Sequence, residues 1–228
     1  MGGPATDGLR PGGGARNDMP DMSVWEIIGT VLGVIGVWLM IRQNIWGWPV
    51  GLVQVAVYAW VFFDAKLYSD AILQAAFFLL QAYGWWHWLR GVKNRAAPLR
   101  PAGRDFEGQA AATLPVTQLG GAAIAGWVAV GAVLTAAWGW FMHRTTDAAL
   151  PWWDAFILVF SLIAQWLQAR KNIENWAGWL VVNTVAIGVY WAKDLRLTSG
   201  LYVIFWLMAL WGWCAWRRTM LKDSAGSG

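Results

Sequence analysis

The sequence predicts an all-α membrane protein with seven transmembrane helices, in which two parallel three-helix repeats are joined by a linker helix. Three observations predict this fold. Hydrophobic residues make up 58% of the 228-residue chain and charged residues 13%, which leaves more apolar surface than a soluble fold of this size can bury. Seven apolar stretches are each long enough to cross about 30 Å of hydrocarbon at about 1.5 Å per residue. Two segments of the chain also repeat one another at an offset of 128 residues.

The apolar stretches set the order of the elements, and they cover residues 23–41, 46–63, 69–89, 116–142, 152–169, 176–192 and 199–217. The second begins with "WGWPVG", but Pro49 falls in the first helical turn, where its missing N–H costs nothing. Residues 1–22 are rich in glycine and proline, which predicts a disordered tail. We therefore expect a first repeat at 23–90, a cytoplasmic loop at 91–115, the linker helix at 116–142, a second repeat at 152–217 and a C-terminal tail at 218–228.

The net charge of +4 is distributed unevenly between the two sides of the membrane. One side, with the N-terminus, holds Lys66, Arg144, Lys193 and Arg196, with Arg10 and Arg16 in the tail. The other side holds Arg42, Arg90, Lys93, Arg95, Arg100, Arg104, Arg170, Lys171, Arg217, Arg218 and Lys222. By the positive-inside rule the second side is cytoplasmic, so the N-terminus is outside and the C-terminus inside. The basic excess is thus a topology signal and not the mark of a nucleic-acid partner.

The repeat is carried by polar turns as well as by apolar helices. "WLMIRQNIWGW" from Trp38 matches "WLQARKNIENW" from Trp166, and "YGWWHW" from Tyr83 answers "WGWCAW" from Trp211. Apolar helices resemble one another by chance, but the shared Arg-x-Asn-Ile argues against that alternative. Three crossings leave the chain on the wrong side for a second copy in the same orientation, so the Ala- and Gly-rich stretch 116–142 must return it. Parallel repeats place a substrate site where the two copies meet, near the middle of the membrane.

Polar and aromatic side chains fall on one face of several predicted helices, and such side chains usually face a protein interior or a wet cavity. In the sixth stretch this face holds Trp176, Trp179, Asn183 and Tyr190, at positions 0, +3, +7 and +14. The second stretch gives Gly47, Gly51, Gln54 and Tyr58, the third Asp70, Gln74, Gln81, Trp85 and Trp88, and the fifth Asp154, Ser161, Gln165 and Gln168. Each repeat is therefore predicted to line one wall of a cavity with amides and rings.

Two other interpretations of these residues stay open. Amide side chains also join membrane helices to one another, which is an alternative for Gln54, Gln74, Gln81, Gln165 and Asn183. Tryptophans near helix ends form interfacial belts, which is an alternative for Trp46, Trp48, Trp88, Trp152, Trp153 and Trp216. Asp70 is near an outer helix end, where it is either solvated or faces an outer vestibule.

Several chemistries lack the residues that they need. His87 and His143 are far apart with no Cys or carboxylate at metal-ligand spacing, and Cys214 is alone. The sequence has no P-loop, no lysine in the middle of a predicted helix to hold retinal, and no ladder of buried carboxylates for ion coupling. It therefore predicts no enzyme, no cofactor and no metal site, and it favours passive movement of one solute by alternating access.

The segment "NIWGWPVGLVQVAVYAWVFFDAKLYSDAILQ", and the W-x-x-W of Trp176 and Trp179 followed by Asn183 and Tyr190, give the chain a family resemblance. Over about residues 23–218 it resembles the PnuC family of bacterial nicotinamide riboside transporters. The resemblance implies a 3+1+3 arrangement similar to SWEET sugar transporters, a homotrimer and a place in the bacterial inner membrane. It also implies facilitated diffusion of the vitamin, which a cytoplasmic riboside kinase traps by phosphorylation.

The resemblance and the helix faces together predict the substrate-binding residues Trp176, Trp179, Asn183, Tyr190, Gln54, Tyr58, Gln74, Gln81, Trp48 and Asp70. Aromatic rings can hold the permanent pyridinium charge of the riboside, at about 0.5 to 2 kcal/mol per contact. A 5′-phosphate would meet no Lys or Arg at the middle of the membrane, so exclusion of the mononucleotide is predicted. The alternatives are a SWEET-like carrier of a neutral sugar or of another vitamin and, in a different class, an intramembrane enzyme or a receptor.

Overall fold

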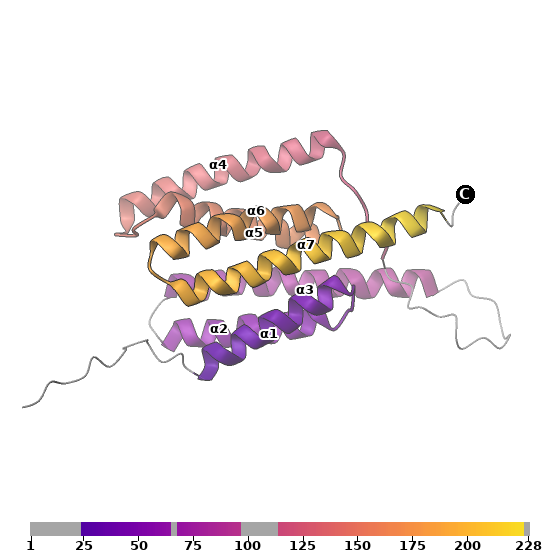
Figure 1. Ribbon diagram of the computed structural model, residues 1–228, viewed down its shortest axis with the longest axis horizontal. Coiled ribbons are helices and arrows are strands. Elements are labelled where there is room, and N and C mark those ends of the chain that lie inside the picture. The colour runs from indigo at the N-terminus through magenta and orange to yellow at the C-terminus, as the bar shows by residue number, and fades with distance from the viewer. Residues whose placement is uncertain (1–23, 65–67, 97–113, 226–228) are drawn as a thin grey trace, which may run out of the picture.

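The computed structural model describes residues 24–64, 68–96 and 114–225, and these residues form seven α-helices (Figure 1). The helices are α1 Val24–Ile41, α2 Gly47–Asp64, α3 Tyr68–Ala96, α4 Gly121–Thr145, α5 Pro151–Ala169, α6 Glu174–Ala192 and α7 Arg196–Ala225. The all-α prediction with seven helices is confirmed. The tail at 1–22 and most of the loop expected at 91–115 lie outside the described residues.

Four of these helices, α1, α4, α5 and α7, are long and apolar enough by length and composition alone to cross a membrane. The other three, α2, α3 and α6, have 18, 29 and 19 residues and are therefore long enough. They carry the amides, indoles and, in α3, end charges that lower an average hydropathy. The helices with the weakest lipid signal are thus the ones that hold most of the predicted site.

Six of the helices form a closed ring. Contacts run from α1 to α2, α2 to α3, α3 to α5, α5 to α6, α6 to α7 and back from α7 to α1, while α4 packs against α5 outside the ring. Figure 1 shows α4 at the upper edge, the second repeat below it and the first repeat lowest. The order around the ring repeats after three helices, as a twofold axis along the helices requires. The two repeats meet at two seams, α1 with α7 and α3 with α5.

The turns between α1 and α2 and between α5 and α6 have the same backbone structure. Gln43 and its repeat partner Lys171 both adopt a left-handed conformation, with φ of 55° and 60°. The amide N–H of Asn44 donates to the Leu39 carbonyl at 2.9 Å, and the N–H of Asn172 donates to its counterpart at the same distance. Local hydrogen bonds and an unusual φ therefore recur at the offset of 128 residues, which apolar similarity by chance does not explain.

The linker begins differently from the sequence-based expectation. Residues 116–120 precede α4 instead of forming its first turns, and the backbone at Thr117 pairs with the α5–α6 turn. Its N–H donates to the Lys171 carbonyl at 3.1 Å, and its own carbonyl accepts from the Ile173 N–H at 2.9 Å. The fully buried Lys171 ammonium donates to the Leu114 carbonyl. The extended segment thus fixes the α5–α6 turn, whereas the equivalent α1–α2 turn is held by a 3.1 Å bond from Gln43 to Thr219 of α7.

Candidate functional site

The middle of α6 carries a buried amide beside an oriented indole. Asn183 is 3% exposed, and its side chain hydrogen-bonds to none of the residues that the structure describes. One helical turn before it, the Trp179 Nε1 donates to Gln168 Oε1 of α5 at 3.1 Å. Gln168 is itself buried, so the indole is held in place from outside its own helix. This combination of a fixed ring and an unpaired amide is what a small polar aromatic solute requires.

The α1–α7 seam brings together predicted residues from both repeats. Tyr190 of α6 stacks on Tyr202 of α7, with ring centroids 5.0 Å apart, and Tyr202 packs edge-on against Phe205 at 6.1 Å. Phe205 faces Gly33 of α1 in the first repeat, where an added Cβ would lie 3.6 Å from the phenyl ring. The Tyr58 hydroxyl is 3.1 Å from the Thr30 hydroxyl of α1. Sequence reasoning did not select Tyr202, although it occupies the position equivalent to Gln74 in the repeat.

The approach of α1 to its neighbours depends on two glycines of one helix face. An added Cβ at Gly33 would lie 2.8 Å from the Gln54 Nε2 and 3.6 Å from Phe205, and one at Gly29 would lie 2.9 Å from the Tyr58 ring. The small residues of α1 therefore leave room for the two predicted polar side chains of α2. Gln54 makes no hydrogen bond to the described residues, so its amide is available to a solute.

The two glutamines of α3 have different surroundings. Gln81 is buried, and its Nε2 donates to the Gly51 carbonyl of α2 at 3.3 Å. Gln74 instead lines a cavity of about 330 Å³ between α2 and α3, together with Val55, Ala59, Ala75, Phe78 and Leu79. Gln81 thus lies with the inward-facing set, while Gln74 is separated from it. The side chain of Asp70 lies outside what the structure describes.

Trp48 and Trp176 lie at the end of the ring where α1 and α5 end, and each is packed in a cluster with a second tryptophan. Trp48 meets Trp88 edge-to-face at 5.4 Å, and Trp176 meets Trp216 edge-to-face at 5.5 Å. Trp88 and Trp216 are 6.2 Å apart, which joins the two pairs. We call these four residues the tryptophan cluster. The indole N–H groups of Trp48 and Trp176 are buried, and within residues 24–64, 68–96 and 114–225 they have no hydrogen-bond partner.

Belt positions and the cluster separate clearly in the structure. Trp46, Trp152 and Trp153 are exposed, as the belt interpretation expects. Trp48, Trp88 and Trp216 are buried, so for these three the belt interpretation is wrong. The signal that identifies them is the repeat, because Trp48 pairs with Trp176, and Trp88 with Trp216, at the same offset of 128 residues.

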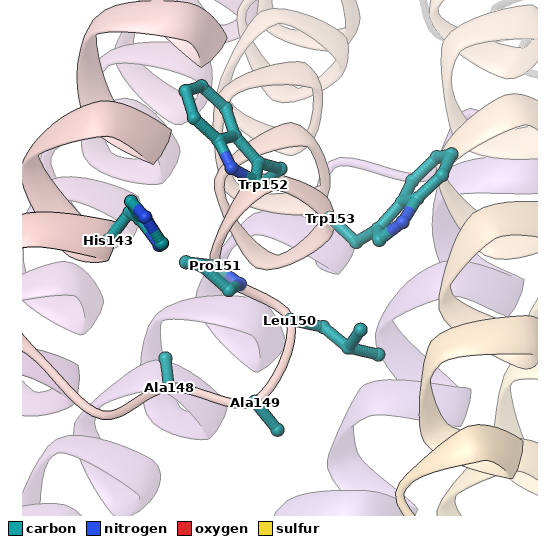
Figure 2. A pocket seen from close by; sticks show the side chains of 7 residues that line it. All are labelled: His143, Ala148, Ala149, Leu150, Pro151, Trp152 and Trp153. Carbon is teal, nitrogen blue, oxygen red and sulfur yellow. The ribbon is translucent and has the colours of Figure 1, made fainter.

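A separate cavity of about 380 Å³ lies at the connection between α4 and α5 (Figure 2). It is lined by His143, by the loop residues 148–150, and by Pro151, Trp152 and Trp153 at the start of α5. The two indoles point apart in the figure. None of the predicted substrate-binding residues lines it. The cavity belongs to the periphery of α5 and not to the space between the repeats.

The site has rings and amides but little charge. At the end of the ring where α6 ends, Lys193 pairs with Asp154 at 2.7 Å. Among the described residues there is no group of three or more His, Cys, Asp or Glu side chains placed to hold a metal ion. What the described site offers a solute is therefore stacking and hydrogen bonding.

Comparisons with known proteins agree with this architecture. A family model described as "Nicotinamide mononucleotide transporter" matches residues 23–218. The chain is 27% identical over 205 residues to the nicotinamide riboside transporter PnuC of Escherichia coli, covering 86% of each chain. It is 30% identical over 202 residues to the riboflavin/roseoflavin transporter RibM of Streptomyces davaonensis, covering 88% of each.

A solved structure is similar over nearly the whole fold. The crystal structure of the vitamin B3 transporter PnuC matches with a TM-score of 0.66 and 25% identity, covering 90% of this chain and 84% of that one. These relatives are transporters and not enzymes. The chain therefore belongs to the nicotinamide mononucleotide transporter family, that is, to the PnuC family of bacterial inner-membrane transporters.

Proposed function

We propose that this protein carries nicotinamide riboside across the bacterial inner membrane by facilitated diffusion. The observation that carries the proposal is the buried amide of Asn183, which forms no hydrogen bond with the described residues and lies one turn from a Trp179 indole that Gln168 orients. Riboside offers a matching pair of features, a cationic ring that binds aromatic faces and a carboxamide that pairs with an amide. PnuC relatives named as nicotinamide riboside transporters support this choice of solute.

The other predicted residues take complementary roles in this proposal. Tyr190 and Tyr58 line the outer side, and Tyr202 stacks on Tyr190. Gln54 and Gln81 offer polar atoms to the ribose hydroxyls. Gln74 faces the cavity between α2 and α3 and is left out of this set, and Asp70 stays a prediction from the sequence. Trp48 and Trp176 close the site at the other end, where their indole N–H donors have no partner in the part of the chain that the structure describes. Hydrogen bonds of this kind contribute about 1 kcal/mol each.

The direction of net transport follows from chemistry outside the protein. The described residues of the candidate site include no series of buried carboxylates for proton or sodium coupling, so we propose that movement is passive. We also propose that a cytoplasmic riboside kinase traps the solute by phosphorylation. The charge distribution supports an outside N-terminus and a cytoplasmic C-terminus. The family resemblance supports a homotrimer in the lipid bilayer.

Riboflavin is the second candidate solute, because RibM covers the chain as fully as PnuC does and is slightly more similar in sequence. Its ring system is neutral and larger, so it gains stacking but no cation–π attraction. A neutral sugar, by contrast, would leave the aromatic residues without a stacking partner of comparable area.

Uptake into empty proteoliposomes tests the proposed function. Labelled nicotinamide riboside should equilibrate across the membrane without an ion gradient, and riboflavin and glucose should not. We expect Asn183→Ala and Trp179→Ala each to lower the initial uptake rate at low solute concentration about 5- to 30-fold, since each removes about 1 to 2 kcal/mol of solute binding. Val181→Ala, on the exposed face of α6, is the matched control and should transport normally. Riboflavin uptake in place of riboside uptake would replace the first candidate with the second.

A further inference from the structure

The tryptophan cluster is built twice, once from each repeat. Trp48 lies against Gly84 and Trp88 of α3, and Trp176 lies in the same way against Gly212 and Trp216 of α7. All four indoles are nearly inaccessible, with exposed fractions of 0%, 3%, 1% and 0% for Trp48, Trp88, Trp176 and Trp216. The rings therefore fill the end of the six-helix ring at which α1 and α5 end.

Two of the four indoles connect one repeat to the other. The Trp88 Nε1 donates to the Ala169 carbonyl at the end of α5, at 3.1 Å across the α3–α5 seam. The Trp216 Nε1 donates to the Met40 carbonyl near the end of α1, at 3.1 Å across the α1–α7 seam. Carbonyls in the last turn of a helix lack their usual partners within the helix and can accept from a neighbouring side chain. The Met40 carbonyl accepts from the Gln43 N–H at 2.9 Å as well as from the Trp216 indole. We call the two indole bonds the seam hydrogen bonds.

The other two indoles stay within their own repeat. Trp48 and Trp176 pack on glycines of the third helix, and their buried N–H groups have no hydrogen-bond partner among the described residues. A buried donor without an acceptor disfavours the state that contains it. In the closed cluster, two hydrogen bonds favour the closed state. The two other indole N–H donors favour an open state, in which they could bond to water. Opposing contributions of this kind keep the closure reversible.

We propose that the tryptophan cluster is the inner gate of the transporter, and that Trp88 and Trp216 hold it closed through the seam hydrogen bonds. Opening separates the third helix of each repeat from the first helix of the other, so both seam bonds must break. Two other hydrogen bonds cross the same seams nearby, from Gln43 to Thr219 and from Arg170 to Tyr83. Both are less buried than the seam hydrogen bonds, so they contribute less because water competes for them. This gate rests on the proposed function only in that the protein works by alternating access, and it does not depend on which solute passes.

A single reporter thiol tests the gate without any solute. Cys214 is the one cysteine in the sequence, so Cys214→Ser gives a thiol-free background. Ala186→Cys then places a thiol on the α6 face that holds Asn183 and Tyr190, at a buried position beyond the cluster. A membrane-impermeant maleimide is applied to vesicles from the side where α1 ends, and separately from the opposite side.

Phenylalanine variants keep a ring but remove the N–H. In the reporter background we expect Trp88→Phe and Trp216→Phe each to raise labelling from the α1-end side about fivefold, the effect of one lost hydrogen bond, and to lower labelling from the opposite side. The double variant should exceed either single one. Trp86→Phe and Trp211→Phe, at exposed positions of the same two helices, are the matched controls and should label at the parent rate.

Two results would overturn the gate. One is parent-rate labelling in folded Trp88→Phe and Trp216→Phe protein. The other is an equal rise in labelling from both sides, which would mean general loosening of the bundle. The labelling assay contains no solute, so its result does not change if riboside uptake fails. The gate and the choice of solute are therefore tested independently.

Discussion

Gly84→Ala and Gly212→Ala are expected to be the most damaging single-methyl substitutions in the chain, lowering the unfolding temperature and abolishing transport. A Cβ at position 84 would lie 2.3 Å from a ring carbon of Trp48. One at position 212 would lie 2.6 Å from three ring carbons of Trp176. Indoles are rigid, and Trp88 and Trp216 pack against the two rings, so neither ring can move aside without displacing its partner.

The size of the effect follows from the packing of the cluster. Overpacking a filled core costs about 1 to 3 kcal/mol and occasionally more, and contacts this short on a rigid ring belong at the upper end. Thermal unfolding followed by tryptophan fluorescence measures the loss of stability, and proteoliposome uptake measures the loss of transport. The matched controls are Gly188→Ala in α6 and Gly200→Ala in α7, where an added Cβ meets nothing within 4 Å. These should keep or slightly raise stability, because alanine is the better helix former by about 1 kcal/mol.

A double-mutant cycle makes the cause of the damage explicit. Trp176→Leu should cost stability in the parent protein by opening a cavity, yet it should partly rescue Gly212→Ala, since the smaller side chain makes room for the new methyl group. Additive losses would show that residues 176 and 212 do not meet, and they would remove the packing basis of the tryptophan cluster.

The repeat could be predicted from the sequence because its signal is chemical as well as apolar. Arg-x-Asn-Ile occurs in both turns, and the structure gives Gln43 and Lys171 in these turns the same left-handed φ. A polar turn at a membrane surface has few reasons to recur by chance, so this match was more informative than any helix. The number of helices followed from length and hydropathy in the same direct way.

The surroundings of individual indoles could not be predicted from hydropathy. An indole near a helix end meets apolar atoms whether it faces lipid or a neighbouring helix, so Trp46 and Trp48 look alike in the sequence although one is exposed and the other buried. The helix face on which a residue lies is predictable, but the element that covers this face is not. Gln74 and Gln81 share a face of α3, yet only Gln81 bonds to the α2 backbone.

The segment before α4 was mispredicted for a similar reason. "LPVTQLGG" is apolar enough to extend the linker helix towards its N-terminus, and hydropathy does not register that Thr117 and Asn172 can pair. The Asn172 side chain donates to the Thr117 hydroxyl at 2.9 Å, and the Glu174 carboxylate accepts from the Leu119 N–H at 2.9 Å. These contacts join residues about 55 positions apart, so no local pattern contains them.

Nicotinamide mononucleotide is expected to bind at least about 100-fold more weakly than nicotinamide riboside, which corresponds to about 2.7 kcal/mol. Its phosphate carries about −1.5 to −2 charge near neutral pH, and the described side chains of the candidate site are amides, hydroxyls and rings. Lys171 is a buried cation near the cluster, 4.7 Å from the Trp88 ring centroid, but its ammonium already donates to the Leu114 carbonyl. Burying an anion without a partner is costly, so the phosphate opposes entry although the nicotinamide ring still fits.

Calorimetry with the purified protein and each ligand in turn measures this difference. The family description names the mononucleotide, whereas the PnuC relatives are named for the riboside. A carrier of the mononucleotide would bind that ligand more tightly, and a carrier of the riboside would show the reverse order of affinities. Gln54→Lys supplies a cation of similar length in α2, and it should narrow the gap by weakening riboside binding through charge repulsion and strengthening mononucleotide binding through attraction. Equal affinities in the parent protein would contradict this prediction. They would show that a cation reaches the phosphate, which requires a charged side chain to move into the ring when the solute binds.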